Sequence, residues 1–177
     1  MHLSSAQRKV LARGVTPVAH TAAGQLITNV DLSTPGLPPI TRCVEKLLGF
    51  TIGVSVPATS FYARIKLTSP TGLEVVTRSQ SGSAITITVY WEILKALGKV
   101  QRGTVNATVA TNTVTTNVAI DPVNLNTAAA FQNGYEVNAA TYFCGCALQL
   151  TGATTLEVHS SMYGNNTLTS NWAVDGG

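Results

Sequence analysis

Charged residues are scarce in this chain of 177 residues: they make up 11% of it, less than half of the roughly 25% typical of soluble proteins. Aromatic residues are also few, at 6%, whereas 45% of the residues are hydrophobic. A disordered chain is poor in aliphatic residues and rich in charge, so this composition excludes disorder. Abundant threonine, serine, asparagine and glycine indicate a folded, β-leaning protein with an uncharged polar surface.

Long apolar stretches are missing as well. No window approaches the ~20 apolar residues of a transmembrane helix, so we expect no contact with a membrane. The basic residues 1–17 are not followed by the apolar segment of a signal peptide, so we expect no secretory leader. Together with an odd number of cysteines, three, this favours a protein that folds in a reducing cytosol.

Lysine and arginine are absent after Arg102. Ten basic and four acidic residues give residues 1–99 a formal charge of +6, whereas one basic and four acidic residues give residues 100–177 a charge of −3. Such a split can orient a partner or favour head-to-tail stacking, although charge placement is a loose constraint and drift would also produce it.

The division in charge coincides with an internal repeat. Residues 65–75 (IKLTSPTGLEV) align with residues 148–158 (LQLTGATTLEV) at a spacing of 83, and Trp91 aligns with Trp172 at a spacing of 81. The predicted organisation is a basic arm over residues 1–9, a first unit over 10–98 and a second unit over 99–177.

Alternation of apolar and polar residues predicts strands in both units. In residues 85–91, Ile, Ile, Val and Trp alternate with Thr, Thr and Tyr, the period of a half-buried strand. Residues 61–67 alternate in the same way, and the turn-forming sequence SPTG follows at 69–72. Short strands with frequent turns predict an all-β protein of two tandem β-sandwich domains, Ig-like or jelly-roll.

Two segments do not decide between helix and strand. Residues 40–49 carry a candidate N-cap at Thr41 and apolar residues at helical spacing. Their counterpart, residues 127–133, is equally undecided. The connection over residues 93–100 is short and apolar, and we interpret it as a rigid joint between the units.

The sequence Cys144-Gly-Cys146 is similar to metal-binding and redox motifs, but the repeat favours another role. At the spacing of 83, Cys144 aligns with Phe61 and Cys146 with Ala63, both on the apolar face of a strand. A reduced cysteine behaves as a small hydrophobe, so a core role is favoured over a disulfide with Cys43 or a metal site. A zinc site would need four ligands at suitable spacing.

No catalytic constellation stands out. The histidines His2, His20 and His159 are far apart, and no nucleophile elbow accompanies them. Asp31 and Asp121 are better explained as turn residues than as calcium ligands. We therefore expect no catalytic, metal or cofactor site. The scattered basic residues are not interleaved with aromatic side chains, so we also expect no nucleic-acid binding.

One set of motifs runs from the end of the first unit through the second. It consists of Val89, Trp91 and Ile93 on one strand, VQRGT at 100–104, a threonine-rich strand at 108–118, Asp121-Pro122, and a strand pair over 150–156. This set resembles the tandem β-domains of structural proteins in tailed bacteriophage particles. The first unit keeps less of the pattern. The resemblance implies a virion component, either a head decoration or a protein of the tail, collar or fibre, and carries over no catalytic residue.

The outward strand positions differ between the units. Tyr62, Arg64 and Lys66 of the first unit are replaced by Phe143, Gly145 and Ala147 in the second. An apolar outer face in a domain of low charge is a candidate subunit interface. We therefore expect a homo-oligomer that also contacts other virion proteins. The first unit would dock through Arg64 and Lys66 on an acidic virion surface, and the second would project or meet the next subunit.

Two other classes of function remain open. A host-surface or carbohydrate-binding adhesin would place Tyr135, Tyr163 or Trp172 against sugar rings. The alternation assigns Trp91 and Trp172 to the core, which weakens this alternative. A hydrolase that uses His159 is the least favoured class.

Overall fold

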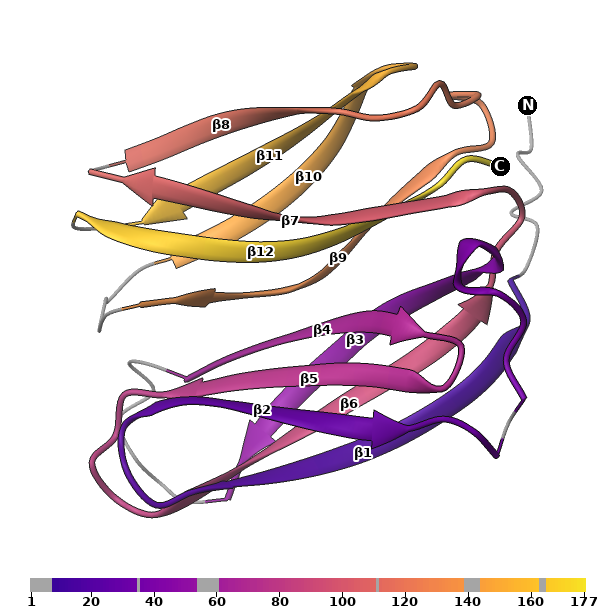
Figure 1. The fold of residues 1–177 in the computed structure, drawn as a ribbon. Helices are drawn as coiled ribbons and strands as arrows, with labels where there is room; N and C mark the ends of the chain where they lie inside the picture. Colours follow the sequence, from indigo (N-terminus) through magenta and orange to yellow (C-terminus); the bar gives the residue numbers. More distant parts are fainter. Residues whose placement is uncertain (1–7, 35, 54–60, 111, 139–143, 163–164) are drawn as a thin grey trace.

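The computed structural model describes residues 8–34, 36–53, 61–110, 112–138, 144–162 and 165–177. These residues form twelve β-strands and a short 3-10 helix, so the predicted all-β class is confirmed (Figure 1). The first half contains β1 (Val10–His20), β2 (Gly24–Asp31), β3 (Cys43–Ile52), β4 (Phe61–Ser69), β5 (Gly72–Ser79) and β6 (Ile85–Lys95). The second half contains β7 (Val100–Val109), β8 (Asn112–Ala119), β9 (Ala129–Val137), β10 (Cys144–Gly152), β11 (Thr155–Met162) and β12 (Asn166–Asp175).

The strands of both halves follow one pairing scheme. The first, sixth and third strands of each half pair in that order, as do the second, fifth and fourth. In an Ig domain the first and second strands share a sheet, whereas here they lie in different sheets, so the strand order favours the jelly-roll alternative. One sheet of each half joins the other into a six-stranded sheet of order β2-β5-β4-β9-β12-β7.

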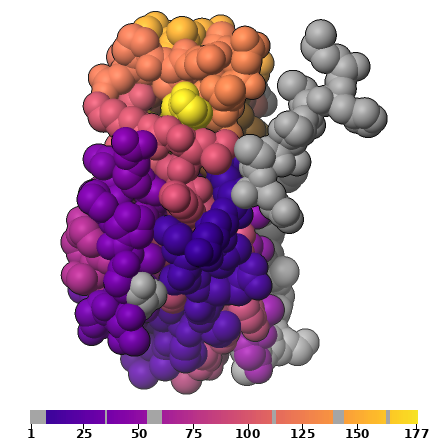
Figure 2. All heavy atoms as spheres, turned by 90° about the vertical axis from the view of Figure 1, so that its right-hand side faces the viewer, coloured from indigo at the N-terminus to yellow at the C-terminus, as the bar shows by residue number. Residues whose placement is uncertain are grey.

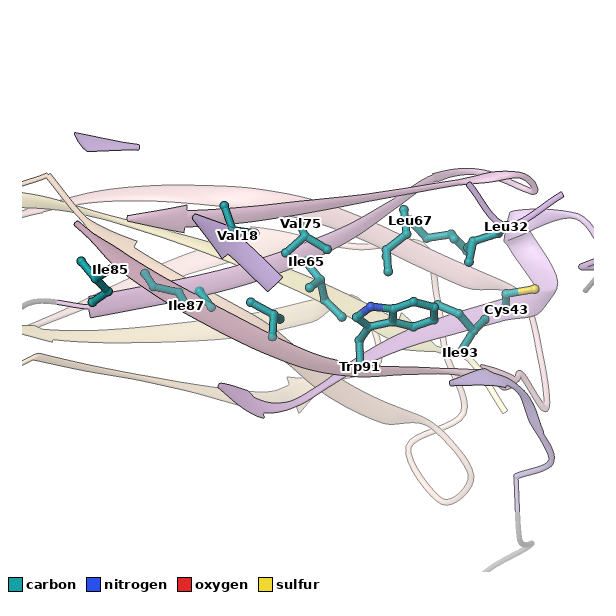
Figure 3. Packing of buried hydrophobic residues seen from close by; sticks show 13 residues of the cluster. Val18, Leu32, Cys43, Ile65, Leu67, Val75, Ile85, Ile87, Trp91 and Ile93 are labelled. Atoms are coloured by element: carbon teal, nitrogen blue, oxygen red, sulfur yellow. The ribbon is translucent and has the colours of Figure 1, made fainter. Parts of the chain in front are cut away.

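Each half has its own hydrophobic core, built from the residues that alternate inward. In the first core Trp91 lies among Ile65, Leu67 and Ile93 (Figure 3). The second core contains Trp172 together with inward residues of β7, β11 and β12. Trp91 and Trp172 are 4% and 7% exposed, as the alternation predicts. Burying each aliphatic side chain of these cores, such as Ile65 or Leu67, stabilises the fold by about 1.5–3 kcal/mol, so the two cores hold the layers together.

The repeat is also present in the register of the strands. Gly14 on β1 lies opposite Trp91, and Gly103 on β7 lies opposite Trp172. A Cβ atom at Gly14 would collide with the ring of Trp91, and one at Gly103 would lie 2.6 Å from Cζ2 of Trp172. Only glycine leaves room for each indole ring above the neighbouring strand.

The two undecided segments both form strands. Ile40–Arg42 makes a single 3-10 turn and β3 follows directly, so the helical interpretation of residues 40–49 is wrong. Thr41 is not an N-cap, since Pro39 precedes the turn and no side chain caps it. Residues 129–137 form β9. In both places pairing with the last strand of the unit outweighs the local helical spacing.

The predicted boundary between residues 98 and 99 lies in the short connection between β6 and β7. A small apolar cluster of Val44, Leu94, Ala96, Val100 and Ala173 surrounds this connection. Figure 2 shows the first unit below the second, with the C-terminal residues near the boundary. The domain limits themselves stay a prediction.

Candidate assembly interface

The second unit covers one edge of the first. Strands β3 and β4 form this edge, and the face of β9, β12 and β7 that points away from the second core lies on it; we call this contact the junction. Asn171 on β12 donates a hydrogen bond from Nδ2 to the carbonyl of Ile65 at 3.0 Å. Arg102 on β7 donates from Nη2 to the carbonyl of Cys43 at 2.7 Å. The junction therefore satisfies backbone acceptors of both edge strands.

A short strand pairing continues the sheet across the junction. Ala63 pairs with Tyr135, and Arg64 pairs with Gly134. Gly134 has a φ of +90°, and a Cβ atom there would collide with the carbonyl of Ala63. Glycine is required at this position both by the backbone conformation and by the close approach of β4.

A carboxylate of the second unit holds two arginines of the first. Oε1 of Glu136 accepts hydrogen bonds from Arg64 Nη2 at 3.1 Å and from Gln25 Nε2 at 2.7 Å. Its Oε2 lies 3.4 Å from Nε of Arg78. The Glu136 side chain is 7% exposed, so its charge is largely withdrawn from water and depends on these partners.

A second ion pair crosses the junction in the opposite sense. Nη2 of Arg102 lies 3.2 Å from Oε2 of Glu45, whose side chain is 1% exposed. Burying a carboxylate is costly unless it is paired and hydrogen-bonded. Arg102 supplies both the charge and the donors, so this arginine of the second unit fixes the start of β3.

Asp175, near the C-terminus, ties the connection to the N-terminal region. Its carboxylate accepts hydrogen bonds from the backbone N–H groups of Leu97 at 2.9 Å and Gly98 at 2.8 Å, and from Nε of Arg8 at 3.0 Å. Burial alone would raise the pKa of Asp175, but these donors outweigh it and hold the pKa below its usual value.

These contacts change the interpretation of the charge split. Glu136 and Asp175 of the acidic half pair with three arginines of the basic half, so part of the asymmetry is neutralised inside the molecule. Arg64 was expected to dock on a virion surface, but its side chain is only 12% exposed and is engaged by Glu136. Lys66 is half-buried on the same strand. Arg64 and Lys66 therefore do not form an exposed basic patch on β4.

Tyr62, expected to point to the outside, is also covered by the second unit. It is 5% exposed, its ring centroid lies 6.1 Å from that of Tyr135, and its hydroxyl lies 3.6 Å from Sγ of Cys144. Burial and the neighbouring thiol raise the pKa of Tyr62, and they raise that of Tyr135 to about 12. Both phenols therefore stay protonated at neutral pH.

The cysteines are free thiols. Cys43 is buried in the first core, while Cys144 and Cys146 are half-buried against the second. Burial raises the pKa of Cys43 and of Cys146. In the described ranges, no group of three or more His, Cys, Asp or Glu side chains is arranged to hold a metal ion. The core role fits these positions.

The candidate residues of the second unit lie on an open strand. Gly145 and Ala147 belong to β10, and Phe143 lies outside the described residues. A Cβ atom at Gly145 would meet nothing within 4 Å, and Ala147 is exposed. No strand of the described chain pairs with β10 on the side opposite β11, although the hydroxyl of Tyr135 donates to the carbonyl of Cys144 at 3.3 Å. Unpaired strand edges of this kind are candidates for pairing with a partner.

One exposed apolar row was not predicted from the sequence. Val15, Tyr90 and Leu48 lie side by side on β1, β6 and β3, on the face that points away from the first core. They are 57%, 37% and 46% exposed. Alternation with Trp91 and Val89 could have placed Tyr90 outside, but nothing in the sequence marks Leu48, because a bulge at this point of β3 shifts the alternation.

A groove opens beside this row. It has a volume of about 290 Å³ and is lined by residues of β3, β4 and β9. Leu48, Gly49 and Phe50 form its β3 wall, and Tyr62 and Gln132 lie across from them. The groove is mostly apolar, and Tyr62 and Tyr135 belong to its lining.

Among the described residues, the histidines and the proposed sugar-binding aromatics are not assembled into a site, and His2 lies outside those residues. His20 is buried with Nε2 2.9 Å from the hydroxyl of Thr77, and His159 contacts Thr115 and Glu157. Of the three candidates for sugar stacking, Trp172 is in the core, Tyr135 is in the junction, and Tyr163 lies outside the described residues.

Within the part of the chain that the structure describes, no helix is long and apolar enough to cross a membrane. No protein-family model, curated protein or solved structure matches the chain. The candidate interface is therefore defined by the geometry of its residues.

Proposed function

We propose that this protein is a non-enzymatic structural component of a bacteriophage virion, a head decoration or a protein associated with the tail, collar or fibre, and that it assembles through subunit contacts. The observation that carries the proposal is the exposed apolar row of Val15, Tyr90 and Leu48. Scattered exposed hydrophobic residues are normal, but a contiguous row across neighbouring strands is typical of an interaction surface. The motif resemblance supplies the phage particle as the setting.

The alternative, a host-surface or carbohydrate-binding adhesin, has less support. Sugar binding by aromatic residues needs accessible ring faces, whereas Trp172 is 7% exposed and Tyr135 packs against Tyr62. The exposed ring of Tyr90 lies in an apolar row with Val15 and Leu48, and its hydroxyl is 3.4 Å from that of Thr51. Such an apolar row suits a protein surface better than a sugar.

The direct test is to locate the protein in particles from the host that produces it. Purified particles would be labelled with a gold-conjugated antibody against the protein and viewed by electron microscopy, with particles from a gene deletion as the control. We expect labelling at one defined place on intact particles. Absence of the protein from particles, by both labelling and mass spectrometry, would overturn the proposal. Specific binding of the isolated protein on a glycan array would favour the adhesin.

A further inference from the structure

We propose that copies of this chain associate head to tail, and that the contact between copies repeats the internal junction. The outer face of β1, β6 and β3 in one copy would cover the β9 and β10 edge of the next. A pairing between β10 of one copy and β3 of the next would join the two three-stranded sheets, β10-β11-β8 and β1-β6-β3, across the contact. The proposal rests on the proposed function for the expectation of self-assembly, and it adds the partner surface and the register.

The internal pairing of β4 with β9 provides the template. Strand β10 is the counterpart of β4, since Leu67 pairs with Leu73 and Leu150 pairs with Leu156 in matching hairpins. Strand β3 is the counterpart of β9, because both carry a bulge beside the tryptophan of the last strand. By this register Cys146-Ala147 takes the place of Ala63-Arg64, so the match of Arg64 with Gly145 and of Lys66 with Ala147 expected from the sequence is wrong by two residues. Gly49-Phe50 takes the place of Gly134-Tyr135.

The glycines at the two bulges support the equivalence. Gly134 adopts a φ of +90° where it meets β4, and Gly49 adopts a φ of +143°. A Cβ atom at Gly134 would collide with β4, whereas one at Gly49 would meet nothing within 4 Å. The space beside the positive-φ glycine is thus occupied by β4 at Gly134 and is open at Gly49. A strand could approach β3 at Gly49 as β4 approaches Gly134.

The two edges differ in burial as the proposal requires. Val44, Ala63 and Ile65 on the edge of the first unit are 0%, 3% and 0% exposed, and the second unit contacts the backbone of Ala63 and Ile65. Their counterparts Ala129, Cys146 and Leu148 are each half-buried. The second unit therefore carries the same apolar edge without a cover.

The two faces differ in the complementary way. Asn171 and Asn133 belong to the face of the second unit that forms the junction, and they are 1% and 0% exposed. Their counterparts in the first unit, Tyr90 and Leu48, are exposed and less polar. The first unit therefore presents an unused copy of the covering face, and its apolar side chains match an apolar edge.

The charges follow the same pattern. Inside the chain, Arg64 on the edge pairs with Glu136 on the covering strand. At the free ends, Ala147 replaces Arg64 and Thr51 replaces Glu136. Both members of this ion pair are lost together, so neither position would bury an unpaired charge. The other charges of the covering face, Arg13 and Lys46, pair with Glu92 of the same copy.

The aromatic contact is also replaced as a pair. Inside the chain the rings of Tyr62 and Tyr135 lie together. At the free ends Gly145 stands in place of Tyr62 and faces open space, while Phe50, 37% exposed, stands in place of Tyr135. In the contact between copies, the ring of Phe50 would lie opposite Gly145 and would occupy the space that the rings of Tyr62 and Tyr135 share in the junction. Since the two surfaces are different, the contact is heterologous, and it closes into a ring or extends as a filament.

The first test is the association of the full chain, measured by sedimentation equilibrium over a wide concentration range. We expect concentration-dependent oligomers, and Leu48→Glu should weaken association at least about tenfold, because it buries a charge in an apolar contact. The matched controls are Leu125→Glu and Ile27→Glu, which alter leucine and isoleucine side chains that are 51% and 56% exposed elsewhere. A chain that stays monomeric, or equal effects of all three variants, would overturn the proposal.

The second test restores the lost ion pair. Ala147→Arg and Thr51→Glu should each weaken association about tenfold, because each places a single charge in the contact. The double variant should recover most of the loss, since the guanidinium introduced on β10 of one copy would meet the carboxylate introduced on β3 of the next. Circular dichroism of each variant would verify the fold. Two disruptive single variants without recovery in the double variant would overturn the register.

The two proposals fail separately. Labelled particles together with a chain that never self-associates would overturn the head-to-tail contact and leave the virion function standing. Head-to-tail oligomers of a protein that is absent from particles would do the reverse.

Discussion

The two units have the same strand order, but one is covered at the edge where the other is open. In the first unit, β3 and β4 lie beneath the second unit, and Cys43, Val44 and Ile65 are fully buried. In the second unit, β9 and β10 carry half-buried residues at the same places. The outer faces differ in the opposite sense, since that of the second unit forms the junction and that of the first is exposed.

The difference teaches which substitutions belong to the fold and which belong to the contact. Residues that both units need, such as the glycine beneath each tryptophan, are the same in both. Arg64, which differs from its counterpart Ala147, lies where one unit touches the other. The packing of glycine against tryptophan is thus kept in both units, whereas this junction position differs.

The largest expected effect tests the shared packing. Gly14→Ala and Gly103→Ala should each destabilise the protein by about 3 kcal/mol, because a Cβ atom would overlap the indole ring of Trp91 or Trp172. Chemical denaturation monitored by tryptophan fluorescence would measure both. Gly145→Ala, where a Cβ atom meets open space, should change stability by less than about 0.5 kcal/mol. A large effect at only one of the two glycines would break the equivalence of the units.

The next effect tests the junction. Glu136→Gln should destabilise the protein by about 2 kcal/mol, because Arg64 and Arg78 lose the charge that compensates their burial. Urea denaturation at neutral pH would measure this cost. Glu157→Gln, at a half-buried carboxylate beside His159 on β11, is the matched control and should stay within about 0.5 kcal/mol. Equal costs for the two variants would remove the distinction between junction and surface.

The sequence predicted the strands that alternate and missed the features that depend on contacts between units. The strand over residues 85–91 and the core positions of both tryptophans follow from period-two alternation. The strand conformation of residues 40–49 and the burial of Arg64 could not be predicted in the same way. Pairing with β6 makes residues 43–52 a strand, and pairing with β9 covers Arg64. Contacts between residues far apart in the chain leave no local pattern.

A smaller effect concerns the end of the second unit. Asp175→Asn should cost about 1.5 kcal/mol at neutral pH, because the carboxylate accepts hydrogen bonds from Leu97, Gly98 and Arg8. The folded-state pKa of Asp175 is lowered, so its stabilisation is present above about pH 4 and is lost as the pH falls through the folded-state value. The stabilities of the two proteins should converge in acid. A gap that does not narrow as the pH falls below the usual aspartate value would contradict this assignment.

The smallest effect concerns a core position at which the units differ. His20 in the first unit is buried against Thr77, and its counterpart in the second unit is Val109, which is fully buried. Burial lowers the pKa of His20, so the unfolded chain binds the proton more readily and stability falls as the pH drops below about 6.5. His20→Val should cost about 1 kcal/mol at about pH 7.5, the worth of one hydrogen bond, and should flatten the stability profile between about pH 5 and 7. The fold should tolerate this substitution, because a valine occupies the equivalent place in the second unit. An unchanged pH profile of stability would show that the pH dependence arises outside this core.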